Sequence, residues 1–246
     1  MNKLLSVIII THNESARIRA CLESVAFADE VLVLDSGSTD DTVAIAKSMG
    51  AQVSHSEDWP GFGPQKNRAL QLATGQWVLS LNADERLTDQ VLRRDVELRS
   101  LRTTDWLRLR LTGDVNKLTH LLYWPGAPRR VQHRFIWLGI RSCNFGVWYR
   151  DFEAVNGFDE TFSGWGHEDA DLVLRLRLQG CSRKNGALAT EVFHLWHSEN
   201  SRTGELANRL RVLARMKDAG PIRAVTGLAE LDRVAGVVVS ELNSPE

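Results

Sequence analysis

The side chains best suited to chemistry lie together in residues 164–172, which read GWGHEDADL. Glu168, Asp169 and Asp171 place three carboxylates within four residues, so the group must be either solvated or held in a site that uses negative charge. The glycines of the stretch permit backbone shapes that other residues resist, and Trp165 offers a flat apolar face of the kind that stacks on a sugar ring. The stretch is therefore either an acidic helix start, which complements the helix dipole, or part of an active site.

Strand and helix patterns alternate over the first hundred residues and would position such a site. Short apolar runs predict buried strands at residues 4–11, 29–35, 51–54 and 76–81. Helices are predicted after Asn13, at 42–49, at 64–73 and at 88–98, with Asn13 and Thr88 as caps. This alternation predicts an α/β layered fold with a mostly parallel sheet.

Polar residues follow three of the predicted strands. Thr11, Asp35 and the turn 82–85 (NADE) all fall at strand carboxyl ends, where open α/β sheets bind ligands. The alternative for Asp84 and Glu85 is a solvated strand-to-helix turn.

Four segments of this half resemble a known family. SVIIITHNE (6–14), VLVLDSGSTDDT (31–42), GFGPQKNRAL (61–70) and WVLSLNADER (77–86) resemble successive blocks of glycosyltransferase family 2, above all the bacterial members that build the lipopolysaccharide core. The resemblance implies the GT-A fold, a central sheet flanked by helices, and a nucleotide-sugar donor.

The resemblance also implies roles for individual residues. The implied donor and nucleotide site comprises Thr11, Asn13, Glu14, Asp35, Ser38, Lys66, Arg68, Asn82 and Asp84. Within it Asp35 would accept a hydrogen bond from the uracil N–H, and Lys66 or Arg68 would face the nucleotide. The acidic turn would be the DxD motif that binds Mn²⁺ or Mg²⁺, both of which suit hard oxygen ligands. Position 82 is Asn where the family usually has Asp, so Asp84 is the sounder metal ligand and metal affinity is expected to be lower than usual.

Residues 144–197 resemble the carboxyl-terminal module of galactosyltransferases, through NFGVW, VNGFDETFSGWGHEDADL and VFHLWH. The implied acceptor-binding residues are Trp165, Gly166 and Glu168. Asp169 would be the catalytic base, and Asp171 a structural acid at the helix start. His194, or with less support His197, would complete the metal site with Asp84. Taken alone, two histidines three residues apart favour surface or capping roles.

Other elements of the second half follow from pattern and resemblance together. Strands are expected at 105–111, 142–148 and 191–195, and helices at 117–124, 151–156, 168–179 and 202–217. Leucines alternate at 172–178 as in a strand, and the resemblance rather than the pattern favours a helix there, closed by Gly180.

A basic segment with interleaved aromatic residues spans 129–141 and contains four arginines. It fits either a membrane-surface patch, which would suit an anionic lipid-linked acceptor, or a basic loop whose aromatic side chains pack on the core.

Composition narrows the function classes. Lys plus Arg number 30 and Asp plus Glu 31, so bulk charge gives no reason to expect nucleic-acid binding. Three cysteines without metal-like spacing indicate free thiols in a reducing compartment. The apolar run at 4–10 is too short for a membrane span and lacks a following cleavage site, so no signal peptide is expected.

The sequence therefore predicts a metal-dependent inverting glycosyltransferase acting in bacterial surface polysaccharide or lipopolysaccharide synthesis. It would move galactose or glucose from a UDP-sugar to a saccharide or lipid-linked saccharide acceptor, in the cytoplasm or at the cytoplasmic face of the inner membrane, with peripheral membrane contact. We expect one domain at 1–218, with a nucleotide-sugar half (1–100) and an acceptor half (101–200), and an appendage at 219–246. The alternatives are a sugar-phosphate nucleotidyltransferase, disfavoured because no Gly-rich loop follows the first strand, and a non-catalytic sugar-nucleotide-binding protein.

Overall fold

The computed structural model describes most of the chain. It covers residues 3–87, 102–112, 118, 122, 124–128, 130–137, 139–141, 144–189, 192–194, 203–218, 220–231 and 237–239. Side chains are described throughout these ranges except at 86–87, 192–194 and 237–239.

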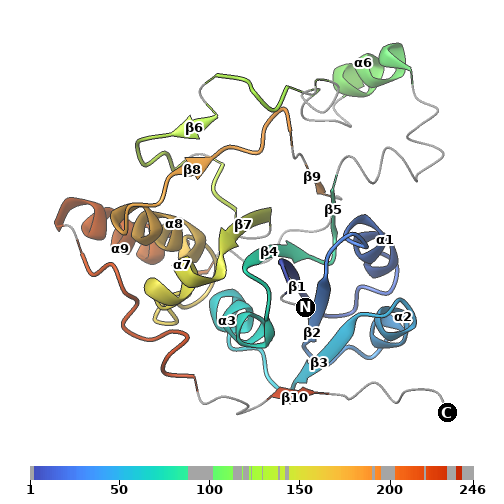
Figure 1. The fold of residues 1–246 in the computed structure, drawn as a ribbon, viewed down its shortest axis with the longest axis horizontal. Helices are drawn as coiled ribbons and strands as arrows, with labels where there is room; N and C mark the ends of the chain where they lie inside the picture. Colours follow the sequence, from blue (N-terminus) through green and yellow to red (C-terminus); the bar gives the residue numbers. More distant parts are fainter. Residues whose placement is uncertain are drawn as a thin grey trace.

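A six-stranded sheet in the order β10-β3-β2-β1-β4-β7 forms the centre of the fold (Figure 1). Its strands are β1 (Leu5–Thr11), β2 (Glu30–Asp35), β3 (Gln52–Ser56), β4 (Trp77–Asn82), β7 (Asn144–Trp148) and β10 (Val237–Val239). The four inner strands are parallel, whereas β7 and β10 run antiparallel at the two edges. The predicted mostly parallel α/β sheet is therefore confirmed.

Helices cover both faces of the sheet (Figure 1). Their bounds are α1 (Ile18–Ser24), α2 (Thr42–Ser48), α3 (Phe62–Leu72), α7 (Tyr149–Ala154) and α8 (Glu168–Leu178). Alternate residues of β1 face opposite sides: Val7 and Ile9 join the core under α1 and α2, whereas Ile8 and Ile10 join the core shared with α3, α7 and α8. Continuous apolar strands of this kind are buried on both faces, as their sequence predicted.

The helix α8 lies between two apolar layers. Leu172 and Leu176, one turn apart, join the core against the sheet, and Ala170 and Leu174 pack with Val212 of α9 (Glu205–Asp218). Leucines at every second position therefore serve two faces of one helix rather than one face of a strand. Gly180 follows the helix with φ of 102°, so the helix and its closing glycine are confirmed.

Two small strand pairs lie beside the main sheet. β5 (Glu85–Leu87) pairs with β9 (Val192–His194), and β6 (Val131–Gln132) pairs with β8 (Arg183–Lys184). The first pair extends from the end of β4, so it fixes the backbone that follows the acidic turn.

The strand predicted at 105–111 is wrong, because residues 103–112 form the helix α6 (Thr103–Thr112). The alternating leucines there do not face a core: Leu111 is 88% exposed, and Trp106 is the buried side chain. The Asp105 carboxylate accepts a hydrogen bond from the Arg102 N–H at 2.7 Å, which stabilises the helix start.

The cap predicted at Asn13 is also wrong, since α1 begins only at Ile18 and its N-cap residue is Arg17. Thr88 and the helix predicted at 88–98 lie outside the described residues, as does most of 117–124. In the described part of the chain, no helix combines the length and apolar character needed to cross a membrane.

The segment that follows α9 packs back onto the body of the protein. Ala224 N–H donates to Val155 O at 2.9 Å, and the Asn156 side chain donates to Ala224 O and accepts from Ala229 N–H. β10 then pairs with β3. These contacts cover a sheet edge that would otherwise present unpaired backbone groups.

Candidate active site

The carboxyl ends of β1, β2 and β4 meet at one edge of the sheet. Thr11 lies opposite Asp35, and Ile10 lies opposite Asn82. Strand order reverses at β1, with β2 on one side and β4 on the other, and such reversals are where α/β sheets bind ligands. The register thus brings the predicted donor residues Thr11, Asp35 and Asn82 together.

The loops after β1 and β2 are joined by hydrogen bonds between side chains and backbone. Asn13 has φ of 53°; its N–H donates to Ser38 Oγ, and its side-chain oxygen accepts from Thr39 N–H, both at 2.8 Å. Glu14 N–H donates to Thr42 Oγ1 at 2.8 Å. Asn13 therefore holds two loops in register instead of capping a helix, and a left-handed backbone is one that Asn adopts readily.

Asp35 organises the turn that follows its own strand. It is 1% exposed, and its carboxylate accepts hydrogen bonds from Gly37 N–H (3.1 Å), Ser38 N–H (3.0 Å) and Ser38 Oγ (2.5 Å). The His55 Nδ1 atom lies 3.2 Å from the same carboxylate. Three of these contacts are to Oδ2, whereas Oδ1 accepts from Ser38 Oγ, so Oδ1 keeps a lone pair that could accept a further hydrogen bond.

The two basic residues predicted to face the nucleotide differ in their surroundings. Arg68 forms an ion pair with Asp58 at 2.5 Å and donates to Ser56 Oγ at 2.7 Å, beside the end of β3. Lys66 is 2% exposed, and its ammonium lies 5.9 Å from the centre of the Phe158 ring. Lys66 thus reaches toward the second half of the chain.

Asn82 and Asp84 end the strand β4 with hard oxygen donors. Asp84 is 7% exposed, and the Asn82 side-chain oxygen is buried without a hydrogen-bond partner in the described part of the chain. Carboxylate and amide oxygens are the ligands that Mg²⁺ and Mn²⁺ prefer, so these residues fit such an ion in kind. Among the described side chains, no three His, Cys, Asp or Glu residues gather as a metal cluster.

The backbone of His194 lies directly opposite Glu85 in the β5–β9 pair. The register therefore places this position next to the turn that carries Asp84, while the His194 side chain and all of His197 lie outside the description. The metal role of His194 stays a prediction.

The loop that precedes α8 is held by α9. Trp165 N–H donates to Thr203 O at 2.9 Å, and the buried Asn208 side chain donates to Ser163 O and Gly166 O at 3.0 and 2.9 Å. Gly164 has φ of 75°, and a Cβ there would lie 2.4 Å from Thr203 O. The first glycine of the GWG motif is therefore needed for this close approach.

Glu168 and Asp169 begin α8 and are both half-buried. Burial and, to a smaller extent, the neighbouring charge of Asp169 raise the pKa of Glu168 to about 7, while Lys66 opposes the rise. Since Lys66 belongs to the half that is predicted to bind the nucleotide, Glu168 lies within electrostatic range of that half. Glu168 is therefore near one of the predicted donor residues.

The third acid, Asp171, has a different environment. It is fully buried and forms ion pairs with Arg175, at 2.7 Å, and with Arg215. Arg175 also donates to Val155 O and Gly157 O at 2.6 and 2.8 Å. This hydrogen-bonded group ties α8 to α9 and to the end of α7, in agreement with the structural role predicted for Asp171.

Contacts between α3 and residue 158 join the two halves of the chain. The Asn67 side chain donates to Phe158 O at 2.9 Å and accepts from Phe158 N–H at 2.8 Å. Asn67 is fully buried, so its two hydrogen bonds hold residue 158 against α3 next to Lys66.

The basic aromatic segment packs its aromatic side chains on the protein. Phe135, Trp137 and Ile140 contact the small core formed by α8 and α9, as the loop interpretation predicted. Arg130 is 9% exposed and donates to two backbone carbonyls, those of Asn185 and Pro125.

Three basic or titratable neighbours of the site were missed by sequence reasoning. Arg17 pairs with Glu14 at 2.8 Å, and the charge of Asp84 adds to the rise in the Arg17 pKa that this pairing causes. Arg183 lies within electrostatic range of Asp169 and donates to Ile136 O and Gly139 O. His55, beside Asp35, is the third. None of them stands in a motif, so only the folded chain reveals them.

Two family models match this chain. Residues 6–99 match the model of glycosyl transferase family 2. This part of the chain is similar to glycosyl transferase family 2 domains. Residues 129–198 match the model described as the N-terminal domain of galactosyltransferase. The predicted family resemblance is therefore confirmed in both halves.

Curated relatives match the family 2 region. An uncharacterized glycosyltransferase of Rickettsia prowazekii is 48% identical over 90 residues, 36% of this chain and 30% of that protein. The lipopolysaccharide core biosynthesis glycosyltransferase LpsC of Rhizobium meliloti is 40% identical over 93 residues, 36% of this chain and 34% of that protein. The matched stretch thus spans about a third of each relative's length.

One solved structure supports the fold over most of the chain, and another matches a third of it. TarS from S. aureus covers 92% of this chain, and 41% of its own, with a TM-score of 0.55 at 18% identity. A glucosyl-3-phosphoglycerate synthase from Mycobacterium tuberculosis, in complex with Mn²⁺, UDP-Glc and phosphoglyceric acid, is 33% identical over 34% of each chain, with a TM-score of 0.31. The predicted GT-A fold is confirmed by the sheet of this chain and by the first of these likenesses.

Proposed function

We propose that this protein is an inverting glycosyltransferase that moves a hexose from a UDP-sugar to a hydroxyl of a saccharide acceptor. The observation that carries the proposal is the position of Glu168, which begins α8 beside Asp169 and lies within electrostatic range of Lys66, a predicted donor residue. A glycosyl transfer needs a donor site and a base near each other, and this placement supports such an arrangement.

Asp169 is the proposed catalytic base. It takes the proton of the acceptor hydroxyl while that oxygen attacks the anomeric carbon, and the bond to the diphosphate breaks on the opposite face of the sugar. A base in this position contributes roughly a hundred- to ten-thousandfold to the rate. The geometry matches the inverting logic of glycoside hydrolases, with the acceptor hydroxyl in the place of water.

Glu168 is the proposed acceptor ligand. Because its pKa is about 7, a fraction of the side chain is protonated at neutral pH and can donate as well as accept a hydrogen bond. Trp165 and Gly166 precede it on the same loop and would bind the acceptor ring beside it.

The donor would lie at the carboxyl ends of β1, β2 and β4. Thr11, Asn13 and Glu14 would contact the base and ribose from one loop, Asp35 and Ser38 from the next. Asp84, with Asn82 and the predicted ligand His194, would hold Mn²⁺ or Mg²⁺, which supplies Lewis-acid stabilisation of the departing diphosphate when bound. Lys66 and Arg68 would add positive charge near the diphosphate of the donor.

Galactose and glucose are the proposed sugars, and bacterial lipopolysaccharide or surface polysaccharide synthesis is the proposed setting. The name of the Rhizobium meliloti relative supports the setting. Because bacterial nucleotide sugars are cytoplasmic, the reaction would take place in the cytoplasm or at the cytoplasmic face of the inner membrane, where a lipid-linked acceptor would bring peripheral contact with the membrane.

Donor hydrolysis tests this proposal without knowledge of the acceptor. We expect one UDP-sugar from a panel of nucleotide sugars to be hydrolysed slowly with Mn²⁺ and not with EDTA. Asp84→Asn should raise the Mn²⁺ concentration for half-maximal rate at least tenfold, whereas Asp218→Asn, at the exposed end of α9, should leave it unchanged. Binding of a donor without any turnover would favour a non-catalytic sugar-nucleotide-binding protein instead.

A further inference from the structure

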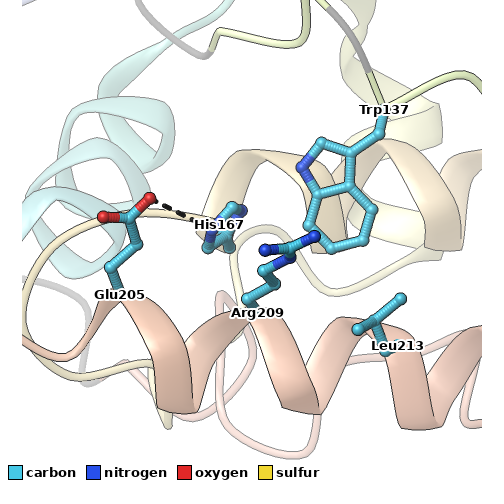
Figure 2. Close-up of a pocket in the computed structure, with 5 residues that line it drawn as sticks. All are labelled: Trp137, His167, Glu205, Arg209 and Leu213. Carbon is cyan, nitrogen blue, oxygen red and sulfur yellow. Dashed lines mark ion pairs between the residues drawn. The ribbon is translucent and has the colours of Figure 1, made fainter.

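A pocket of about 350 Å³ lies between α9 and the loop that leads into α8 (Figure 2). It is lined by Trp137, His167, Glu205, Arg209 and Leu213. None of these residues is among the predicted donor-binding, acceptor-binding or catalytic residues, although His167 lies on the predicted acceptor loop. The pocket nevertheless borders the acidic pair, because His167 is the residue immediately before Glu168.

Arg209 brings a positive charge to this pocket. Its side chain is exposed, and it makes no hydrogen bond or ion pair with any residue that the structure describes. Figure 2 shows the guanidinium directed toward Trp137 and His167, away from Glu205 one turn earlier on the helix. A guanidinium in this position is available for a carboxylate or a phosphate group, which it binds through paired N–H donors.

His167 brings a polar atom without a partner. Its Nε2 atom is buried and has no hydrogen bond within the described part of the chain, and the nearest carboxylate oxygen, on Glu205, lies 4.0 Å away. That distance is too long for a hydrogen bond. A buried polar atom that lacks a partner is costly, so a turn of the imidazole that brings Nε2 to a hydroxyl group of a ligand would be favourable.

Trp137 supplies the apolar wall. Its ring meets the His167 ring edge to face, with centroids 5.1 Å apart and planes at 72°. The indole is half-buried against the core of α8 and α9, so its position is fixed before a ligand binds. A flat aromatic wall beside polar groups is the usual composition of a small-molecule site.

The pocket is rigidly connected to the acidic pair. The side chain of Asn208, next to Arg209 on α9, donates to the carbonyls of Ser163 and Gly166 on the loop before His167. Asn208 is 3% exposed, so these hydrogen bonds between α9 and the loop lie inside the protein. A group bound by Arg209 is therefore held at a set position relative to Glu168 and Asp169.

We propose that this pocket is an acceptor subsite that selects saccharides carrying a phosphate or carboxylate group. The anionic group binds Arg209, the sugar ring packs on Trp137, and a ring hydroxyl pairs with His167. This inference rests on the proposed function and adds the class of acceptor, an acidic sugar, to it.

Binding of small sugars tests the subsite directly. Glucose 6-phosphate and galacturonate serve as probes, and glucose and galactose as their neutral controls, with dissociation constants from ligand-observed NMR titration. We expect each anionic sugar to bind at least tenfold more tightly than its neutral parent. Arg209→Gln should abolish that difference, and Trp137→Ala should weaken binding of both classes.

Lys217→Gln is the matched control, because it removes one exposed positive charge from the same helix outside the pocket. It should preserve the preference for anionic sugars. Equal binding of anionic and neutral sugars, or an equal loss in both charge variants, would overturn the subsite. Wild-type donor hydrolysis is measured in parallel, so donor turnover without a charge preference rejects the subsite alone, and a charge preference without donor turnover rejects the proposed function alone.

Discussion

Three neighbouring carboxylates acquire three different environments in this fold. Asp171 is fully buried between two arginines, whereas Glu168 and Asp169 remain half-buried at the first turn of α8. The sequence identified the cluster and, through resemblance, the structural acid. It could not show that burial raises the pKa of Glu168, because that depends on packing from distant parts of the chain.

The raised pKa of Glu168 predicts a pH-dependent loss of stability at the residue scale. Its folded pKa, about 7, exceeds the unfolded value of 4.5, so the folded state binds the proton more tightly. Stability should therefore fall as pH rises from about 4.5 to about 7 and then level off. Replacing Glu168 by Gln removes this fall, and after allowance for solvent screening we expect the variant to be more stable at pH 8 by about 1–2 kcal/mol.

Urea unfolding at pH 5 and pH 8 measures this effect. Glu57→Gln, at an exposed carboxylate, is the control and should show no such gain. A Glu168→Gln variant whose advantage over wild type is the same at both pH values would show that the carboxylate is not destabilised by its surroundings.

At the scale of elements, two segments with alternating leucines were predicted differently, one as a strand and the other as a helix. Both 105–111 and 172–178 alternate, and both are helices. In α8 the alternation serves two buried faces, and in α6 its last leucine is 88% exposed. Period alone cannot distinguish a helix packed on two sides from a strand, and only the family resemblance gave the right answer for α8.

The buried Arg175 predicts a large loss of stability when it is removed. Its guanidinium is fully buried and bonds Asp171 and two backbone carbonyls, those of Val155 and Gly157. Arg175→Leu removes these bonds, leaves the buried Asp171 with Arg215 as its remaining ion-pair partner, and should lower the free energy of unfolding by about 3–5 kcal/mol. Arg177→Leu, two positions along the same helix and only half-buried, should cost less than about 1 kcal/mol in the same urea titration. Equal losses would show that the buried group contributes nothing particular.

At the scale of the whole molecule, the strands of the first half could be predicted from the sequence. The packing of the C-terminal segments could not. Continuous apolar runs indicated four strands of a parallel sheet, and the structure pairs these strands in parallel. The packing of residues 220–231 against Asn156, and the pairing of β10 with β3, depend on contacts between residues far apart in sequence. Neither segment has a repeating pattern that would reveal its partner.

The close packing of this C-terminal segment predicts that Gly227 is intolerant of a side chain. A Cβ at Gly227 would lie 2.0 Å from Asn156 O and 3.0 Å from Phe158 O, so the segment would have to move. Gly227→Ala should lower stability by about 2 kcal/mol or more through overpacking. Gly126→Ala, whose Cβ would meet nothing closer than 3.9 Å, is the control and should unfold at the same denaturant concentration as wild type. Unchanged stability in both variants would mean that the segment is loosely attached.

The central claim is that Asp169 acts as the base of a glycosyl transfer while other residues bind the donor. The most direct measurement compares Asp169→Asn with wild type in two assays: binding of the UDP-sugar by calorimetry, and its turnover in the presence of Mn²⁺. The account predicts a donor dissociation constant within about twofold of wild type and a turnover lowered by a factor of a hundred or more. Turnover that survives in Asp169→Asn with normal donor binding would contradict it and place the base elsewhere.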